Sequence, residues 1–351
     1  MPEHEPKNPT VTIQIVTWNS RRYIGDCLKA VFAQTYRDFQ VLVIDNNSAD
    51  GTVELIQDQF PQVPIFKNNR NHGFARAHNQ GLRSLHTPYV VLCNPDVLMT
   101  DTWLETMMQA VANERYQDVG SFGGKLLRLV MLNDEYHETE QTDIVDSCGL
   151  AVCRNQRVVE LGAGKLSADF TTDIEVFGQS GALVAYRREA LEAVMITDHS
   201  ERPEYLDEYF FVYKEDVDLA WRLQLAGWRS QTIIDAEAYH VRAMQGSEIK
   251  SRKQLVAQKR SQSKITRLYS YRNQFLILMK DVPSKLYWKH FLAIAWYEFQ
   301  KFGYVLLFEQ SSLVGLVQAL KLRRAMRRRR KAQYATAKIA PAELEKWFDQ
   351  C

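Results

Sequence analysis

Two hydrophobic patterns alternate along the first hundred residues of the chain. Apolar, largely β-branched runs predict three buried strands, at 11–19, 39–48 and 89–96. Between them, apolar residues three and four positions apart predict three amphipathic helices, at 21–35, 48–60 and 73–85. Apolar strands joined by helical crossovers pair in parallel and are covered by helices on both faces. The pattern therefore predicts an α/β fold of the Rossmann-like kind, with a mostly parallel central sheet flanked by helices.

Polar residues gather where these strands end. In an open parallel sheet, ligands bind beyond the carboxyl ends of the strands. The residues that this rule places along one edge of a cleft are Thr17, Trp18, Asn19, Asp45, Asn46 and Asp96. Asp96 follows Asn94 and Pro95, and an Asn-Pro-Asp sequence is also a common turn. The strand ends therefore predict a ligand site, with a plain turn as the alternative at Asp96.

The pattern after Asp96 is less regular. It predicts, in order, a helix at 101–114, short strands and loops at 119–166, and a strand that begins or bends at Ser180 and Gly181. Glu215 and Asp216 then open an amphipathic helix for which Gly227 is a natural terminating residue. Because the helix dipole favours carboxylates in a first turn by a few tenths of a kcal/mol, this acidic pair also has a purely structural explanation.

Composition restricts the class of protein. The 351 residues are 46% hydrophobic and 25% charged, which is typical of a globular chain with one large domain or two smaller ones. The five cysteines are odd in number and form no CxxC pair, so neither a disulfide framework nor a zinc site is indicated. We expect reduced thiols in a cytoplasmic protein. Residues 1–9 form a polar leader without the apolar core of a signal peptide, so export is not expected.

The net charge of +2 conceals a basic run at 321–331. The preceding stretch, 286–322, mixes Trp, Tyr, Phe and Leu with Lys, as helices at a bilayer interface beside anionic headgroups do. No run reaches the roughly 18 apolar residues of a spanning helix. We therefore predict that 248–351 is a basic, helical, membrane-associating region and that the protein lies peripherally on the inner face of the cytoplasmic membrane. A solvated basic helix and a nucleic-acid site are the alternatives.

Seven motifs, in order, resemble those of the family 2 glycosyltransferases. They are TWN at 17–19, DNNSADGT at 45–52, NHGFARAHNQG at 71–81, NPDV at 94–97, SGALVAYRR at 180–188, DEYFFVYKEDVDLAWRLQLAGW at 207–228, and His240. NPDV, GF and DEYFFVYKEDVDL are most similar to the rhamnosyltransferase branch of that family. The resemblance implies a GT-A fold over 10–247, a nucleotide-sugar donor and a divalent metal. The basic segment 250–264 would then connect this domain to the C-terminal region, across the site.

The resemblance also implies a metal site. In the family an Asp-x-Asp motif holds Mg²⁺ or Mn²⁺, which stabilises the departing diphosphate as a Lewis acid. Here the motif reads Asn94, Pro95 and Asp96, so one carboxylate remains and metal coordination is carried over to Asp96 alone. His240 stands where related enzymes offer a further metal or phosphate contact. The predicted cofactor is therefore Mg²⁺ or Mn²⁺ held by Asp96 and His240.

The donor contacts follow from the same resemblance. The TWN segment and Asp45 correspond to the pyrimidine site, where a carboxylate accepts a hydrogen bond from the ring N3–H. The family's Ala-Arg-Asn is Ala77, His78 and Asn79 here, so Arg76 is the candidate for the missing phosphate contact. The complete predicted donor-binding set is Thr17, Trp18, Asn19, Asp45, Asn47, Arg76, Asn79, Asn94, Ser180 and Gly181.

For sugar transfer the resemblance implies direct displacement with inversion, in which a carboxylate takes the proton of the acceptor hydroxyl. Asp216 is the predicted base and Glu215 the second candidate. Asp218 is expected to be structural, and Trp221 and Arg222 to serve helix packing and local pairing. An aromatic cluster is interpreted either as an acceptor platform or as core, and it consists of Tyr209, Phe210, Phe211 and Tyr213.

The predicted activity is transfer of L-rhamnose from dTDP-rhamnose to a hydroxyl group of a cell-envelope glycan or a lipid-linked saccharide. A UDP-sugar donor is one alternative, and a catalytically weak, transferase-like binding or scaffold protein is another. A sugar nucleotidyltransferase is disfavoured because no glycine-rich basic loop follows the first strand. The expected partners are the donor, the acceptor and an anionic membrane surface, and nucleic acid is not among them.

Overall fold

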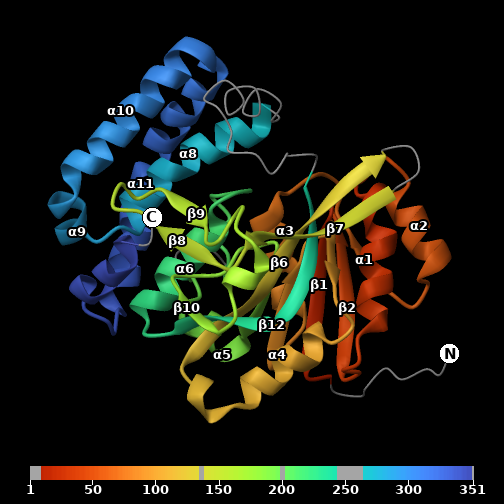
Figure 1. The fold of residues 1–351 in the computed structure, drawn as a ribbon. Coiled ribbons are helices and arrows are strands. Elements are labelled where there is room, and N and C mark those ends of the chain that lie inside the picture. The colour runs from red at the N-terminus through yellow and green to blue at the C-terminus, as the bar shows by residue number, and fades with distance from the viewer. Residues whose placement is uncertain (1–8, 134–137, 198–201, 243–263, 350–351) are drawn as a thin grey trace.

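One mixed sheet organises the protein. The computed structural model describes residues 9–133, 138–197, 202–242 and 264–349. Within these ranges ten strands form a sheet whose order is β10-β12-β6-β11-β4-β1-β2-β3, with β5 paired to β12 and β7 paired to β6. A separate two-stranded sheet contains β8 and β9. Figure 1 shows the large sheet in the middle of the molecule, with the C-terminal helices grouped on one side of it.

The first half of the sheet is parallel, as predicted. Its strands are β1 (Val11–Thr17), β2 (Phe39–Asp45), β3 (Ile65–Lys67) and β4 (Tyr89–Cys93). The connecting helices are α1 (Arg21–Ala33), α2 (Thr52–Gln59) and α3 (Phe74–Ser84). Thr17 pairs with Asp45 in the register of β1 and β2, so the polar strand ends meet at one edge.

Both faces of this half are covered. In β4, Val91 and Cys93 belong to a core that includes residues of α1 and of α4 (Trp103–Ala112). The alternate residues, Val90 and Leu92, belong to a second core that includes residues of α3 and α5 (Arg188–Ala193). Because successive side chains of a strand point to opposite faces, a strand buried on both sides has a continuous apolar sequence.

The second half of the sheet is mixed. Strand β11 (Leu183–Arg187) runs antiparallel between β4 and β6 (Val119–Asn133), while β12 (Arg229–Arg242) runs parallel to β6. The remaining strands are β5 (Val97–Met99), β7 (Glu138–Ser147), β8 (Leu150–Val152), β9 (Val158–Glu160) and β10 (Ile174–Val176). In place of short strands and loops, the segment from Val119 contains a strand of 15 residues. The hydrophobic pattern also does not predict β12, which has 14 residues.

Helix α6 (Glu215–Leu225) lies between two cores. Val217, Ala220 and Trp221 pack into a cluster shared with the C-terminal helices. Leu219 and Leu223 pack into the core that also contains residues of β4 and β11. The helix therefore has two apolar faces, and the predicted terminating residue, Gly227, has a positive φ of 85°.

The C-terminal region is helical and packs closely on α6. It contains α8 (Lys264–Lys280), α9 (Ser284–Lys289), α10 (Phe291–Phe308) and α11 (Leu313–Ala335). The short 3₁₀ segments of the chain are Glu114–Tyr116, Ser167–Asp169, Gln310–Ser312 and Pro341–Phe348. Lys280 at the end of α8 is buried and pairs with Asp207 and Asp218 of the first domain. A shared core and a buried ion network therefore join the two regions.

Other expectations have mixed outcomes. Cys27, Cys93 and Cys148 are free and buried, but Cys153 is disulfide-bonded, so the expectation of reduced thiols is wrong at that position.

In the part of the chain that the structure describes, no helix has the length and apolar character needed to cross a membrane. The predicted polar leader and the predicted basic connection at 250–264 lie almost entirely outside the described residues.

Candidate active site

The ends of β1 and β2 are tied together around Asp45. Its buried carboxylate accepts hydrogen bonds from Thr17 Oγ1 at 2.9 Å and from the backbone N–H and hydroxyl of Ser48. Asn19 crosses between the same two loops, because its backbone N–H donates to Ser48 Oγ and its Oδ1 accepts from the N–H of Ala49. Trp18 is 51% exposed beside them. The structure thus brings four of the predicted donor residues to one edge.

Two of the strand-end residues adopt left-handed backbone. Asn19 and Asn47 have φ values of 52° and 65°, a region that Asn tolerates better than most residues. Asn47 is exposed at the end of β2, whereas its neighbour Asn46 is buried and donates to the carbonyl of Gly73. The loop before α3 is therefore fixed against the end of β2.

The end of β4 brings Asp96 to His240. Strand β5 pairs Val97 with His240 of β12, and the N–H of Val241 donates to the carbonyl of Asp96. As a result, Asp96 Oδ2 lies 3.5 Å from His240 Nε2. The other oxygen, Oδ1, is buried and has no hydrogen-bond partner in the structure. Asn94 is held by its backbone N–H, which donates to Ala182 O at 2.8 Å.

His240 is oriented by a second carboxylate that the sequence does not identify. Its Nδ1 lies 2.8 Å from Asp146 Oδ2, at the end of β7. Burial lowers the pKa of His240, but the hydrogen bonds to Asp146 and Asp96 outweigh this effect and raise the pKa to about 9. Nothing in the spacing of the chain links Asp146 to His240, because the two residues are 94 positions apart.

Asp96 and His240 offer a small set of metal-binding atoms. The described residues contain no group of three or more His, Cys, Asp or Glu side chains able to hold a metal ion. Mg²⁺ usually takes only one or two protein carboxylates together with substrate phosphates and water. The unpartnered Oδ1 of Asp96, next to the imidazole of His240, fits that kind of shared site and does not fit a metal held by protein alone.

Asp216 lies at the start of α6 with both oxygens held by backbone groups. The N–H of Gly181 donates to Oδ2 at 3.1 Å, and the N–H of Val217 donates to Oδ1 at 2.8 Å. Burial raises the pKa of Asp216, while these two hydrogen bonds and the nearby charge of Lys214 limit the increase. A side chain at position 181 would meet Asp216 and Phe74, because an added Cβ would lie 3.5 Å from Asp216 Oδ2 and 3.6 Å from Phe74 Cζ.

Glu215 differs from Asp216 in its surroundings. It is 5% exposed, and its Oε2 has no hydrogen-bond partner in the structure. Burial and the neighbouring charge of Asp216 raise the pKa of Glu215 well above its ordinary value. Of the two predicted bases, Asp216 is therefore the one whose ionised form is disfavoured less.

The loop before α6 is strained. Phe211, Tyr213 and Lys214 all have φ between 65° and 69°, which is unusual for residues other than glycine. Asn273 of α8 holds this loop, because its Nδ2 donates to the carbonyls of Val212 at 3.0 Å and of Tyr213. Strained backbone of this kind clusters at functional sites.

Ser180 faces a partner that sequence reasoning missed. Its hydroxyl donates to Glu160 Oε1 at 3.2 Å, and Ser147 donates to the other oxygen of that carboxylate. Glu160 comes from β9, a strand of three residues with no distinctive sequence signal.

Two residues of the predicted set that binds the sugar donor lie away from the sheet edge that carries Asp45 and Asp96. Asn79 is fully buried, and its side chain is hydrogen bonded to backbone groups of Tyr205 and Leu206. Arg76 is exposed and lies 3.7 Å from Glu208 on the wall of a separate cavity. No contact joins either residue to Asp45 or Asp96 among the described residues.

The aromatic cluster, interpreted above as either an acceptor platform or core, is partly buried and partly exposed. Phe210 is fully buried in the core next to Trp221. Tyr209 and Phe211 line the same cavity as Arg76, and Tyr213 is 41% exposed. The residues expected to be structural behave as predicted: Asp218 and Arg222 form a buried ion pair at 2.9 Å.

Solved structures identify the fold of this protein. Staphylococcus aureus TarS 1–349 in complex with UDP superposes with a TM-score of 0.50 at 15% identity, covering 96% of this chain and 91% of that chain. GalNAc-T7 with UDP, GalNAc and Mn²⁺ gives a TM-score of 0.59 at 13% identity, covering 96% of this chain but only 57% of that chain. The fold is therefore the predicted α/β GT-A fold with a C-terminal helical region.

The family follows from the sequence. The model of glycosyl transferase family 2 matches residues 12–195, so the chain belongs to that family and is a glycosyltransferase. A curated relative is the N-acetylglucosaminyl-diphospho-decaprenol L-rhamnosyltransferase of Mycobacterium tuberculosis. It is 25% identical over 258 residues, which cover 65% of this chain and 75% of the relative.

Proposed function

We propose that the protein is an inverting glycosyltransferase that moves L-rhamnose from dTDP-rhamnose to a hydroxyl group of a lipid-linked saccharide or a cell-envelope glycan. The observation that carries this proposal is the carboxylate of Asp216, held by the N–H groups of Gly181 and Val217 at the sheet edge. A base in this position typically contributes about 10² to 10⁴ in rate.

The donor is proposed to lie along the ends of β1, β2 and β4. Asp45 would accept the N3–H of thymine or uracil, with Trp18 and Asn19 beside the base. Asn94, Ser180 and Gly181 would contact the donor sugar, and the exposed Asn47 the ribose. The hydrogen bonds around Asp45 support this role because they fix the carboxylate in place.

Asp96 and His240 are the residues proposed to hold Mg²⁺ or Mn²⁺. When bound, the metal supplies Lewis-acid stabilisation of the negative charge on the departing diphosphate. His240 would hold the ion as the neutral imidazole. Asp146 would then keep the ring oriented with Nε2 towards the ion.

The choice of rhamnose rests on the mycobacterial relative, whose name states L-rhamnosyl transfer, and on the NPDV and DEYFFVYKEDVDL segments. At 25% identity a UDP-sugar donor is the alternative. The same relative acts on a diphospho-decaprenol acceptor by name, which supports a lipid-linked acceptor for this chain.

An exposed apolar surface supports attachment to the inner face of the cytoplasmic membrane. It is formed by exposed side chains of α9, α10 and the start of α11, of which the most exposed are Trp288, Leu292, Trp296, Phe299, Leu307, Phe308, Val314, Val317 and Leu320. The basic second half of α11 adjoins this surface along the chain. Apolar side chains beside cations fit an anionic lipid surface.

The first test measures thermal stabilisation by a panel of nucleotide sugars, and sugar transfer in the variant Asp216→Asn. A donor that binds only the folded protein raises its thermal stability, so dTDP-rhamnose with Mn²⁺ is expected to stabilise the protein more than UDP-sugars do. Asp216→Asn is expected to lower sugar transfer by about 10² to 10⁴ while keeping the stabilisation by the donor. Asp58→Asn on the exposed side of α2 is the matched control. Turnover that survives in Asp216→Asn would contradict the proposed mechanism, and a stronger response to UDP-sugars would contradict the choice of donor.

A further inference from the structure

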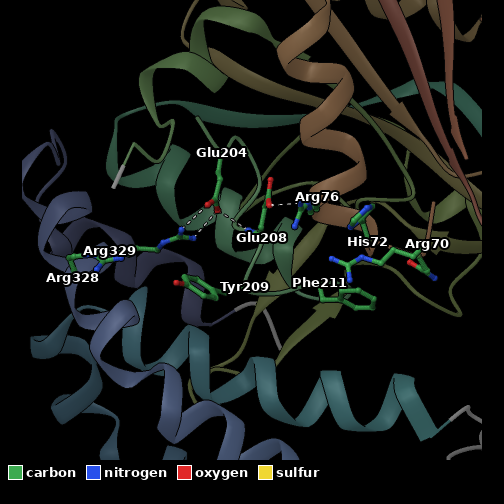
Figure 2. A pocket seen from close by; sticks show the side chains of 10 residues that line it. Arg70, His72, Arg76, Glu204, Glu208, Tyr209, Phe211, Arg328 and Arg329 are labelled. Atoms are coloured by element: carbon green, nitrogen blue, oxygen red, sulfur yellow. Dashed lines mark hydrogen bonds and ion pairs between the residues drawn. The ribbon is translucent and has the colours of Figure 1, made fainter. Parts of the chain in front are cut away.

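The proposed donor site lacks the phosphate contact for which the sequence indicates Arg76. That guanidinium lies 3.7 Å from Glu208 on the wall of a separate cavity, where Figure 2 shows the two side chains facing each other. The diphosphate of a nucleotide sugar is an anion, and its negative charge grows as the sugar leaves. A cation that stabilises this charge is therefore expected beside Asp96 and His240.

Arg128 of β6 is the cation that the fold places there. In the parallel pairing of β6 with β12 it stands opposite His240. Successive side chains of a strand point to alternate faces, and neighbouring strands lie roughly 4.8 Å apart, so two residues opposite each other project side by side from the same face. Arg128 therefore leaves the sheet next to the histidine of the proposed metal site.

Arg128 is largely buried in an apolar stretch of its strand. Its side chain is 17% exposed, and its neighbours Leu127 and Leu129 are buried. A buried guanidinium loses its hydration and has to regain that free energy from an anion that accepts its hydrogen bonds. The position is therefore unfavourable for a cation unless an anion lies against it.

Asp146 meets only part of this requirement. Its Oδ1 lies 3.8 Å from Arg128 Nε, which is beyond hydrogen-bonding distance, and that nitrogen is buried without an acceptor in the described ranges. The other oxygen of Asp146 lies 2.8 Å from His240 Nδ1. Asp146 thus orients the histidine, and no described residue gives Arg128 the close, forked pairing that guanidinium groups make with carboxylates.

The end of the Arg128 guanidinium borders open space. Among the described residues, and apart from the adjoining residues of the chain, a Cβ added at Gly164 would have only Arg128 Nη2 within 4 Å, at 3.9 Å. Lys125, the other cation of β6, is instead paired with Glu237 at 2.8 Å. Of these two cations, Arg128 is therefore the one with donors left for a ligand.

The charges around the proposed metal site favour the same assignment. With His240 neutral, the two carboxylates of Asp96 and Asp146 would together cancel the charge of a divalent ion. Arg128 is always protonated, so its charge leaves the loaded site positive towards a diphosphate. The forked donors of a guanidinium also match phosphate oxygens that the ion does not take.

We propose that Arg128 binds the diphosphate of the nucleotide-sugar donor beside Asp96 and His240. This role rests on the proposed function, in which the bond between the anomeric carbon and the β-phosphate oxygen breaks and its electron pair stays on that oxygen. The acceptor oxygen forms the new bond to the carbon and gives its proton to Asp216. Arg128 stabilises the negative charge that accumulates on the leaving diphosphate.

The test measures binding of dTDP to the full chain by calorimetry in EDTA, where no metal ion links the phosphates to the protein. Arg128→Met keeps a long side chain and removes its donors, so it is expected to weaken dTDP binding about 10- to 100-fold. Thymidine, which has no phosphate, is expected to bind both proteins equally. The control is Arg115→Met, which removes an exposed arginine just before β6, at the opposite end of the strand.

Two results of this measurement would overturn the proposal. The first is equal affinity for dTDP in Arg128→Met and Arg115→Met. The second is a loss of thymidine binding in Arg128→Met as large as the loss of dTDP binding, because it would place the defect away from the phosphates. If Arg128→Met does not fold, Arg128→Gln takes its place with the same expected loss, because its amide can still donate to Asp146.

A role of Arg128 in supporting Asp146 alone predicts a different result. Asp146→Asn is expected to weaken binding of Mn²⁺ and to leave binding of dTDP in EDTA no weaker. An arginine that only supported Asp146 and His240 would behave in the same way when replaced. Arg128→Met would then lose affinity for dTDP with Mn²⁺ present and keep it in EDTA, and the proposal would be wrong.

Parallel measurements with UDP separate this inference from the proposed function. If the unaltered protein binds UDP and not dTDP, the choice of donor is wrong, and the same variants test Arg128 with UDP. If the unaltered protein transfers sugar and Arg128→Met binds the nucleotide equally well, the role of Arg128 alone is refuted. If the unaltered protein binds neither nucleotide, the proposed function fails, and the role of Arg128 fails with it.

Discussion

At the scale of single residues, Glu215 and Asp216 are neighbours in the chain but have different surroundings. Asp216 has two backbone donors and a lysine nearby, whereas Glu215 has an oxygen without a partner. Burial alone raises the pKa of both groups, so the difference between them comes from hydrogen bonding and charge. The sequence predicts that the acidic pair opens a helix, but it does not predict which of the two carboxyl groups ionises more readily.

Lys214 controls the pH range in which Asp216 can act as a base. Its charge lowers the pKa of Asp216, and its own pKa, lowered mainly by burial, is about 8, so it stays protonated in acid. Transfer is expected to fall as the pH drops through the pKa of Asp216, which lies above 3.8. Lys214→Met removes the charge and raises that pKa, so the acidic limb of kcat/KM against pH is expected to move to higher pH.

Lys214→Arg is the control for this prediction. It keeps a positive charge beside Asp216, so its acidic limb is expected to stay near that of the unaltered protein. The measurement is the initial rate of transfer from pH 4 to 8, at low acceptor concentration. An acidic limb in Lys214→Met that coincides with that of Lys214→Arg would show that Asp216 is not the titrating base.

At the scale of elements, helix α8 holds the loop that precedes α6. Asn273 donates hydrogen bonds to the carbonyls of three loop residues, Phe210, Val212 and Tyr213. Arg272 donates to the carbonyls of Tyr209 and Phe210. These contacts hold a loop with three left-handed residues in front of α6, and they come from 60 or more positions further along the chain.

Asn273 is therefore expected to position the base without touching substrate. Asn273→Ala removes three hydrogen bonds to carbonyls of the loop, and a displacement of the base by about 1 Å can cost about 10² in rate. We expect kcat to fall roughly 10- to 100-fold while the KM for the donor and the stabilisation by the donor change less than about twofold. Gln333→Ala is the control, because the amide of Gln333 in α11 has no hydrogen-bond partner in the structure. A parallel loss of donor affinity in Asn273→Ala would show a general structural defect instead.

The extent of sequence prediction differs between the two halves of the sheet. Strands β1, β2 and β4 and the helices between them follow from local periodicity, because these strands are largely apolar and buried. Strand β3 is not predicted, because it has only three residues and is largely exposed. Strand β12 does not follow, since its apolar residues are interrupted by polar ones such as Gln231 and Glu237. The pairing of His240 with Asp96 depends on that strand and on β5, which has only three residues. Contacts of this kind are made by tertiary pairing and leave no local pattern.

At the scale of the whole molecule, the buried ion network makes the C-terminal helices part of the enzyme. Asp207 pairs with Lys280 of α8 and with Arg329 of α11. Burial opposes ionisation of Asp207, but these two cations outweigh it and hold the pKa well below its ordinary value. Since breaking a buried ion pair commonly costs about 3–5 kcal/mol, the helices cannot separate from the transferase domain at little cost. The apolar surface of α10 is therefore fixed relative to Asp216.

This rigid connection makes membrane binding testable by substitutions on α10 alone. Leu292, Trp296 and Phe299 are 83%, 61% and 67% exposed and lie on one face of the helix, at positions i, i+4 and i+7. Replacing all three by Ser is expected to weaken binding to vesicles of phosphatidylcholine and phosphatidylglycerol at least tenfold, or about 1.4 kcal/mol. Because these side chains pack little against the protein, the unfolding temperature should change by only a few degrees. Phe66→Ser, at a 49% exposed position of β3 away from α10, is the control, and flotation with vesicles is the measurement. If the triple variant floats with the vesicles as well as Phe66→Ser does, α10 does not bind the membrane.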